Sequence, residues 1–117
     1  MSFIKKSAIA VLSTAALCGG GVAVATPPMG YVQGTINTVI SFTSGTFMVR
    51  MNGTVSTPPS CSASNQFVVS TDTKSGKAII ATVLAAQAAG KQLGIQGLGT
   101  CNASPGSEDI NYVYFSP

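Results

Sequence analysis

The sequence predicts a small α+β domain with five strands and one helix in the order β-β-β-α-β-β. Apolar and polar side chains alternate with a period of two in several short segments, which indicates half-buried strands. The segment 76–89 instead repeats apolar residues at helical spacing. Two cysteines, Cys61 and Cys101, flank this segment and are candidates for a disulfide. The fold that we expect is a mainly antiparallel sheet with the helix packed on one face, or a small closed barrel.

The first two strands form a predicted hairpin. Within 32–42 the even positions are mostly apolar and the odd positions are polar, with one exception at Val39. Thr43-Ser44-Gly45 has the composition of a turn, and apolar residues alternate again over 47–51. We therefore expect one strand on each side of this turn.

Three shorter segments supply the remaining strands. Residues 66–70 include three consecutive apolar residues and follow a break rich in Ser, Thr and Pro at 56–60. Residues 91–98 alternate around Leu93 and Ile95, and residues 110–115 are rich in β-branched and aromatic side chains. These segments give the third, fourth and fifth strands.

The helix is expected over 76–89 because one stripe carries residues at helical spacing: Ile80, Val83, Leu84, Gln87 and Ala88. Ser75 or Thr73 can cap its N-terminus, and Gly90 is placed to end it. The element order that results is shared with the oligonucleotide/oligosaccharide-binding (OB) barrel. The likeness is in order alone, so an open sheet and an OB-like barrel both remain possible outcomes.

The N-terminus has the three parts of a secretory signal peptide over residues 1–25. Lys5 and Lys6 give a positive start, residues 8–17 are uncharged and mostly apolar, and Ala23-Val24-Ala25 offers a peptidase site. We expect cleavage between Ala25 and Thr26, which leaves a single small domain over 26–117.

Three other interpretations of this N-terminal segment are less favoured. A retained membrane anchor is disfavoured because Gly19-Gly20-Gly21 interrupts an apolar stretch that is already short for a bilayer. A lipoprotein site at Cys18 is disfavoured because Leu17 precedes it, and a mitochondrial presequence should contain Arg, which this segment lacks. We therefore expect an exported chain, periplasmic or extracellular, with no stable membrane anchor after cleavage.

Cleavage also decides the cysteine count. Removing residues 1–25 from 117 leaves 92, and the departing segment takes Cys18 with it. The two cysteines that remain, Cys61 and Cys101, are far apart in sequence, which favours a structural disulfide over a redox pair. Closing a loop of this length stabilises a fold by about 4 kcal/mol in the chain-entropy model.

The composition excludes several kinds of chemistry. The chain contains no histidine, which removes His-based triads and most transition-metal sites. Glu108 and Asp109 are adjacent at a predicted strand entry, so we expect them to point to opposite faces and to be solvated. The mature chain would carry four basic and three acidic residues without a basic patch, which argues against nucleic acid. We expect no catalytic residue, no metal and no cofactor.

Glycines at 94, 97 and 99 superficially suggest a phosphate-binding loop. Such loops lie between a strand and the start of a helix, whereas these glycines follow the helix and fall within a strand. We expect them to permit a bulge or a close approach of another chain segment.

Polar aromatic and amide side chains form the remaining candidate ligand surface. We select five residues as its candidates: Tyr31, Arg50, Gln96, Tyr112 and Tyr114. Gln33, Gln92 and Asn111 are further polar residues of the same surface type. Tyrosines and amides suit sugar or protein binding, but they equally suit any solvent-facing β surface.

The segment Ala85-Ala86-Gln87-Ala88-Ala89-Gly90-Lys91 followed by Gly97-Leu98-Gly99-Thr100-Cys101 resembles small exported proteins of Gram-negative bacteria. Their shared pattern is a helix ending in Ala-x-x-x-Gly-Lys, a strand, Gly-x-Gly-x-Cys and a tyrosine-containing last strand. The resemblance covers about residues 61–115 and implies an envelope or secreted location, without an activity. In element order and in its single disulfide, the chain is also loosely similar to the B subunits of AB5 toxins, which are pentameric glycan binders.

Three functional hypotheses follow. The first is a non-enzymatic exported module that binds a protein or glycan partner. The second is a glycan-binding subunit of a toxin or adhesin. The third is a small hydrolase or inhibitor, and an enzyme of this kind would need a cleft that gathers Glu108 or Asp109 with Lys or Tyr. The sequence leaves the partner and the oligomeric state open.

Overall fold

A computed structural model describes residues 28–116 of the chain. The predicted signal peptide, its Ala25–Thr26 cleavage site and Cys18 lie outside the described residues. In chain order the elements are β2 (Tyr31–Gly34), β3 (Ile36–Ser41), β4 (Thr46–Met51), β5 (Ser62–Ser70), α2 (Lys74–Ala89), β6 (Gln92–Gly97) and β7 (Gly106–Ser116).

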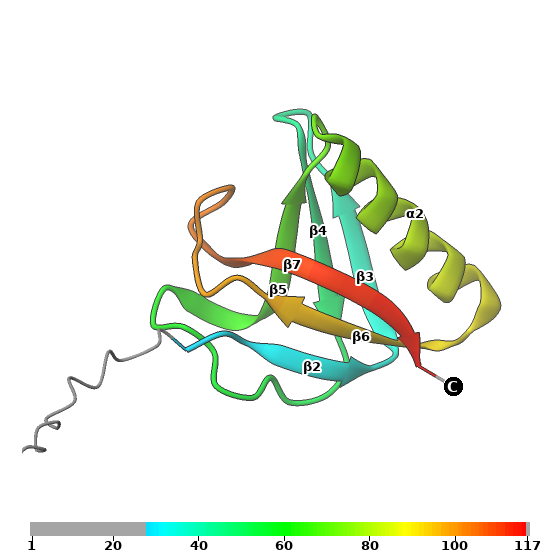
Figure 1. Ribbon diagram of the computed structural model, residues 1–117, viewed down its shortest axis with the longest axis horizontal. Helices are drawn as coiled ribbons and strands as arrows, with labels where there is room; N and C mark the ends of the chain where they lie inside the picture. The colour runs from blue at the N-terminus through cyan, green and yellow to red at the C-terminus, as the bar shows by residue number, and fades with distance from the viewer. Residues whose placement is uncertain (1–27, 117) are drawn as a thin grey trace, which may run out of the picture.

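The strands form one mixed sheet in the order β2-β6-β7-β5-β4-β3, with α2 packed on it (Figure 1). Four of its strand pairings are antiparallel, and β5 pairs with β7 in parallel. The α+β class with one helix on a sheet is therefore confirmed for the described residues. The prediction of five strands is wrong, because the sheet has six.

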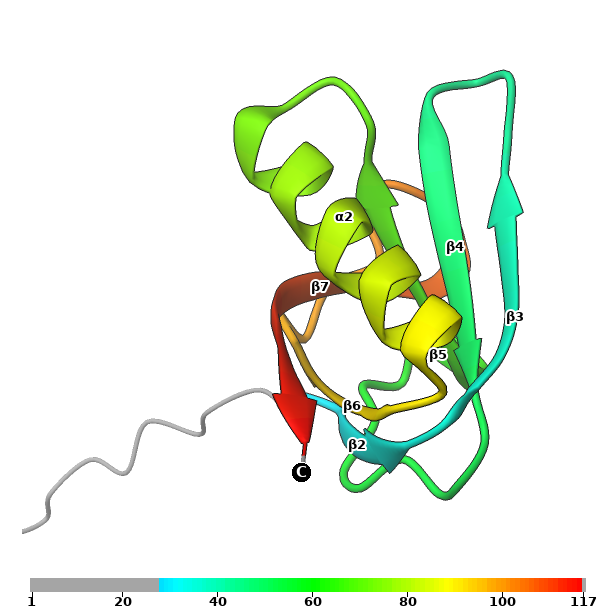
Figure 2. The ribbon, with the colours of Figure 1, turned by 90° about the vertical axis from the view of Figure 1, so that its right-hand side faces the viewer.

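The extra strand arises where the predicted strand 32–42 divides at Thr35. The first part, β2, pairs with β6, whereas the second part, β3, pairs with β4 at the opposite end of the strand order. The Thr35 carbonyl accepts a hydrogen bond from the Asn52 amide at 2.9 Å, which fixes the chain at this division. Because the apolar–polar alternation continues across Thr35, the sequence pattern gives no sign of the change in partner. Figure 2 shows β2 and β3 following one another around the curved sheet.

The helix begins two residues before the predicted start and ends where predicted. Thr73 is the N-cap, and its hydroxyl accepts a hydrogen bond from the Gly76 amide at 2.9 Å. Gly90 adopts the left-handed conformation, with φ of 65°, and its amide bonds back to the helix, as expected of a C-terminal stop.

The buried side of α2 differs from the predicted stripe. Gly76, Val83 and Ala86 are buried, whereas Leu84 is 44% exposed and Ala88 is also exposed. Ile79 and Ile80 also pack against the core from this side. A Cβ atom at Gly76 would stand 1.9 Å from the Ser70 carbonyl oxygen, so the start of the helix approaches the end of β5 closely and requires glycine there.

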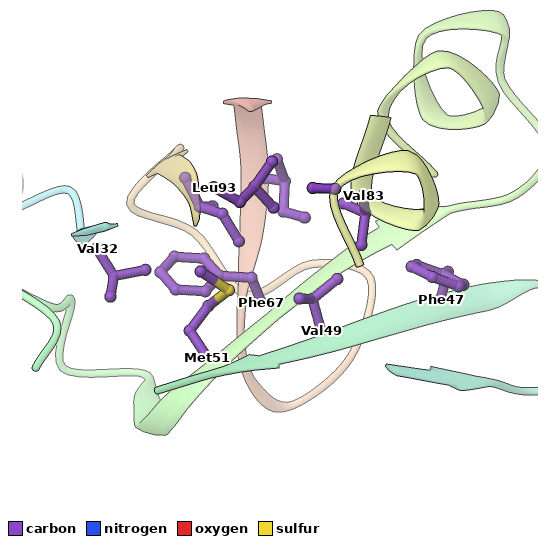
Figure 3. Close-up of a cluster of buried hydrophobic side chains, with 10 residues drawn as sticks. Val32, Phe47, Val49, Met51, Phe67, Val83 and Leu93 are labelled. Atoms are coloured by element: carbon purple, nitrogen blue, oxygen red, sulfur yellow. The ribbon is translucent and has the colours of Figure 1, made fainter. Parts of the chain in front are cut away.

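The core lies between the helix and the inner face of the sheet. Its buried residues come from the helix and from all strands except β3: Val32, Phe47, Val49, Met51, Phe67, Val83, Ala86, Leu93, Ile95 and Ile110. In Figure 3 Val32, Met51, Phe67 and Leu93 point toward one another from four different strands. Burial of these side chains is the main favourable term for a domain of this size.

The predicted disulfide is confirmed. Cys61 and Cys101 are bonded, with their Cα atoms 6.1 Å apart. The bond joins the segment just before β5 to the loop between β6 and β7, and so closes the chain across the helix. A structural disulfide is typical of a chain that folds outside the cytoplasm. Within residues 28–116, no helix has the length and apolar character needed to span a membrane.

Candidate functional site

Side chains from β2, β6 and β7 meet on the outer face of the sheet. Tyr31 lies opposite Gln96 and Gln96 opposite Tyr112, which makes one row across the three strands. The next row consists of Gln33, Gly94 and Tyr114. We call the resulting surface the Tyr–Gln face, defined by Tyr31, Gln33, Gln96, Tyr112 and Tyr114. Directly opposed residues share a sheet face, and Val32, Ile95 and Val113 between them belong to or pack against the core.

The ring of Tyr114 lies across Gly94. A Cβ atom added at Gly94 would stand 2.2 Å from Cζ of this ring, so the ring occupies the space that any other residue would fill. We expected the glycines at 94, 97 and 99 to permit a close approach of another segment, and Gly94 does so. The approaching group is a tyrosine of the Tyr–Gln face.

A chain of hydroxyl groups continues from Tyr114. The Tyr31 hydroxyl donates to Oε1 of Gln33 at 3.0 Å, so its oxygen is left to accept from the Tyr114 hydroxyl, with which it is hydrogen-bonded. The hydrogen bond to Tyr31 is the largest cause that raises the pKa of Tyr114 above its usual value. The hydrogen bond to Tyr31 restrains the Tyr114 hydroxyl.

Tyr112 and Tyr114 present neighbouring aromatic rings to solvent. Their centroids are 6.4 Å apart and their planes are inclined by 34°, while the residues are 49% and 37% exposed. Beside Tyr112, a shallow hollow of about 280 Å³ lies between β7 and α2. Its lining residues carry no charge: Ser75, Ala78, Ile79, Thr82, Asn111, Tyr112 and Val113. Tyr112 therefore belongs both to the Tyr–Gln face and to the lining of this uncharged hollow.

Gln96 is held by the backbone beneath the face. Its side-chain nitrogen donates to the carbonyl oxygens of Gly30 at 3.2 Å and Gly97 at 3.4 Å. These bonds fix the orientation of the amide between Tyr31 and Tyr112. The Tyr–Gln face therefore combines restrained aromatic rings with a restrained amide, an arrangement that limits the entropy lost when a ligand binds.

Of the five predicted ligand residues, Arg50 lies apart from the other four. It is exposed on β4, opposite Thr38 on one side and Gln66 on the other, and its guanidinium donates to Oε1 of Gln66. Gln33, which sequence reasoning assigned only to the general polar surface, is part of the face. Its spacing of two from Tyr31 was the signal that could have placed it there.

Glu108 is buried, which corrects the expectation of a solvated strand entry. It is 1% exposed, and its Oε2 accepts hydrogen bonds from the amides of Gly30 at 2.8 Å and Gly99 at 2.9 Å. Oε1 has no hydrogen-bond partner among the described residues. Cβ atoms placed at Gly30 or Gly97 would stand 2.2 Å and 2.0 Å from carboxylate oxygens, so glycines make room for this group.

Asp109 is also largely buried and points toward the disulfide loop. Its carboxylate accepts from the Thr100 hydroxyl at 2.6 Å and from the amides of Asn102 at 2.8 Å and Ala103 at 3.0 Å. Both carboxylates accept hydrogen bonds from the loop after β6, so neither is the solvated side chain that the sequence predicted. The hollow beside Asp109, bordered by Val68 and Leu98, has neither Lys nor Tyr in its lining.

Comparisons of this chain with protein-family models, with curated proteins and with solved structures find no match. In the part of the chain that the structure describes, no cluster of three Cys, Asp or Glu side chains could hold a metal ion. The candidate site rests on the geometry of the Tyr–Gln face.

Proposed function

We propose that this chain is an exported, non-enzymatic binding module and that the Tyr–Gln face is its ligand surface. One observation carries the proposal: β2, β6 and β7 bring all three tyrosines of the chain to one face, two of them with exposed rings. Tyrosines fixed by hydrogen bonds supply large contact area at low entropic cost, which is why they are enriched at binding sites.

We infer that the sheet curves toward a small barrel of the OB type, which would support this role. β2 and β3 follow one another in the chain but pair with β6 and β4 at the two ends of the strand order, an arrangement that supports a curved, barrel-like sheet in which the outer edge of β3 stays open. The helix between β5 and β6 and the parallel pairing of β5 with β7 also support this inference. OB barrels commonly serve as binding scaffolds, but fold alone does not assign a ligand.

The ligand class that the face favours is an uncharged glycan. Flat tyrosine rings can stack against the apolar C–H faces of sugars, while amides and hydroxyls can pair with sugar hydroxyls. The face and the adjoining hollow carry no charged side chain, which disfavours phosphate groups and strongly acidic partners. Export and a disulfide fit a module that meets such ligands outside the cytoplasm.

The experiment is a glycan array probed with labelled protein, which is purified from the export compartment after expression of the full precursor. Positive spots are then titrated by calorimetry with the parent chain, Tyr112→Ala and the control Leu84→Ala, which changes an exposed apolar residue of α2. We expect Tyr112→Ala to weaken binding about tenfold or more, equivalent to about 1.4 kcal/mol, and Leu84→Ala to leave it unchanged.

Two outcomes would count against the proposal. An array without signal would remove the glycan as the ligand class. Equal affinity of the parent chain and Tyr112→Ala would remove the Tyr–Gln face as the site, whichever glycan is bound.

A further inference from the structure

We propose that the outer edge of β3 is a self-association surface, through which two copies of this chain pair their β3 strands antiparallel about a twofold axis. The inference is independent of the ligand of the Tyr–Gln face. It concerns the other end of the strand order, where β3 is the last strand.

The two strands at the ends of the strand order differ in whether their outer backbone groups are hydrogen-bonded. The outer side of β2 is covered, since Tyr31 and Ser56 exchange backbone hydrogen bonds of 3.1 Å and 2.8 Å. Within residues 28–116, by contrast, β4 is the sole strand paired with β3. Figure 2 shows β3 at the margin of the molecule, with β4 on one side and no element on the other.

The backbone groups on this open edge can be assigned from the hairpin. The Phe42 amide donates to the Thr46 carbonyl at 2.9 Å, so Phe42 directs its backbone groups toward β4. Because the direction alternates along an antiparallel strand, Ile40 does the same. Val39 and Ser41 therefore direct their N–H and C=O groups away from the sheet.

The strand lacks the charges and prolines that often protect an open edge. Residues 36–42 contain no charged residue and no proline, and four of the seven are β-branched. Its register irregularity lies between Ile36 and Thr38, at one end of the strand, and leaves 38–42 regularly paired with β4. Natural proteins often protect edge strands with charges, prolines or bulges. The edge of β3 has neither charge nor proline, and its irregularity is confined to residues 36–38, so residues 38–42 are suited to pairing.

A second copy is the occupant that this strand fits. With Ile40 opposite its own counterpart, Val39 of one copy faces Ser41 of the other, and their outward backbone groups satisfy each other. The uncharged strand contains nothing that repels an identical strand, and Ile40 meets an apolar side chain. In this register Phe42, which is 44% exposed, lies opposite Thr38 of the second copy.

The dimer should be reversible and should leave the Tyr–Gln face open. Pairing of one short strand buries less than the roughly 1,600 Å² of a standard interface, so we expect dissociation on dilution. Since the Tyr–Gln face lies on β2, β6 and β7, each dimer would carry two free faces, and a multivalent ligand would be held more tightly than by one.

The test is sedimentation velocity of the exported chain over a wide concentration range, with two variants that alter the same positions. T38K/F42K places like charges opposite each other across the proposed axis, whereas T38K/F42E places opposite charges there. We expect the parent chain and T38K/F42E to dimerise as concentration rises and T38K/F42K to remain monomeric. Circular dichroism of each variant checks that the fold is retained.

Three results would overturn the proposal. A parent chain that stays monomeric at every concentration contradicts self-association. This holds also if the β3 edge is found to bind a different protein. A T38K/F42K variant that dimerises like the parent places the interface elsewhere. A folded T38K/F42E variant that stays monomeric contradicts the twofold register.

Discussion

Replacement of Gly97 by alanine tests whether the buried Glu108 carboxylate holds the β2, β6 and β7 segments together. A Cβ at position 97 would stand 2.0 Å from Oε2 and 2.2 Å from Cδ of Glu108, which is far inside van der Waals contact. Gly97 is not among the glycines with positive φ, so its backbone conformation accepts alanine. The loss of unfolding free energy in Gly97→Ala must therefore come from displacement of the Glu108 carboxylate.

The magnitude follows from what the carboxylate holds. Once displaced, Oε2 loses its hydrogen bonds from the amides of Gly30 and Gly99, which tie the start of β2 and the loop after β6 to β7. A hydrogen bond to a charged group contributes about 1.5–3 kcal/mol, so the loss of both costs about 3–6 kcal/mol. A domain of this size has about 5–15 kcal/mol of stability in total, so Gly97→Ala should be severely destabilising.

Urea unfolding, monitored by circular dichroism with the disulfide intact, measures this cost. The control is the same substitution in a Glu108→Ala background, where the added methyl group meets no carboxylate and should cost less than about 1 kcal/mol. An equal cost of Gly97→Ala in both backgrounds would refute the reasoning, because the loss would then arise in the backbone.

Three further predictions follow from particular contacts. Replacing Cys61 and Cys101 together by alanine should lower the unfolding free energy by about 4 kcal/mol, measured in urea against the oxidised parent, and no change would show that the closed loop is immaterial. Thr73→Ala should cost about 1 kcal/mol and lower Tm by about 4–8 °C, whereas Thr73→Ser should retain the cap. Tyr31→Phe removes the acceptor that raises the pKa of Tyr114, so the last tyrosine to ionise in an ultraviolet titration should shift toward lower pH. This interaction is fully present below a pH of about 10 and is lost as pH rises through the raised pKa of Tyr114. A last ionisation step that stays at the same pH in Tyr31→Phe would contradict the assignment.

Much of the fold could be predicted from local pattern. Thr73 and Gly90 mark the helix ends by their capping chemistry. The pairing of Cys61 with Cys101 was predicted by counting the cysteines that would remain after removal of residues 1–25. The helix ends depend on residues that are neighbours in sequence, and the disulfide prediction depends on the number of cysteines. They need no knowledge of which strands become neighbours in space.

Features that depend on non-local neighbours could not be predicted. The division at Thr35 is set by β6 and β4, which lie far along the chain, and not by any change in alternation at that residue. Glu108 looked solvated because the glycines that surround it, Gly30 and Gly97, come from distant segments. Buried carboxylates of this kind can be identified only once their donors are placed.

The candidate site shows the same limit. Residue type alone placed Tyr31, Gln96, Tyr112 and Tyr114 in one set, and the strand register brings these four together. Arg50 was included among the candidate ligand residues because it is polar. The strand pairing instead places Arg50 of β4 beside Gln66 of β5. The position of Gly94 beneath the Tyr114 ring depends on the register between β6 and β7.

The most direct test of the proposed binding face compares glycan arrays of the parent chain and of Gly94→Ala. The added methyl group displaces the Tyr114 ring into solvent without altering any tyrosine, and because that ring is already exposed, the fold should be retained. We predict that Gly94→Ala loses the signal at the spots that the parent chain binds, while its unfolding midpoint in urea stays close to that of the parent. Identical arrays for the two proteins would contradict the assignment of the Tyr–Gln face as the ligand surface.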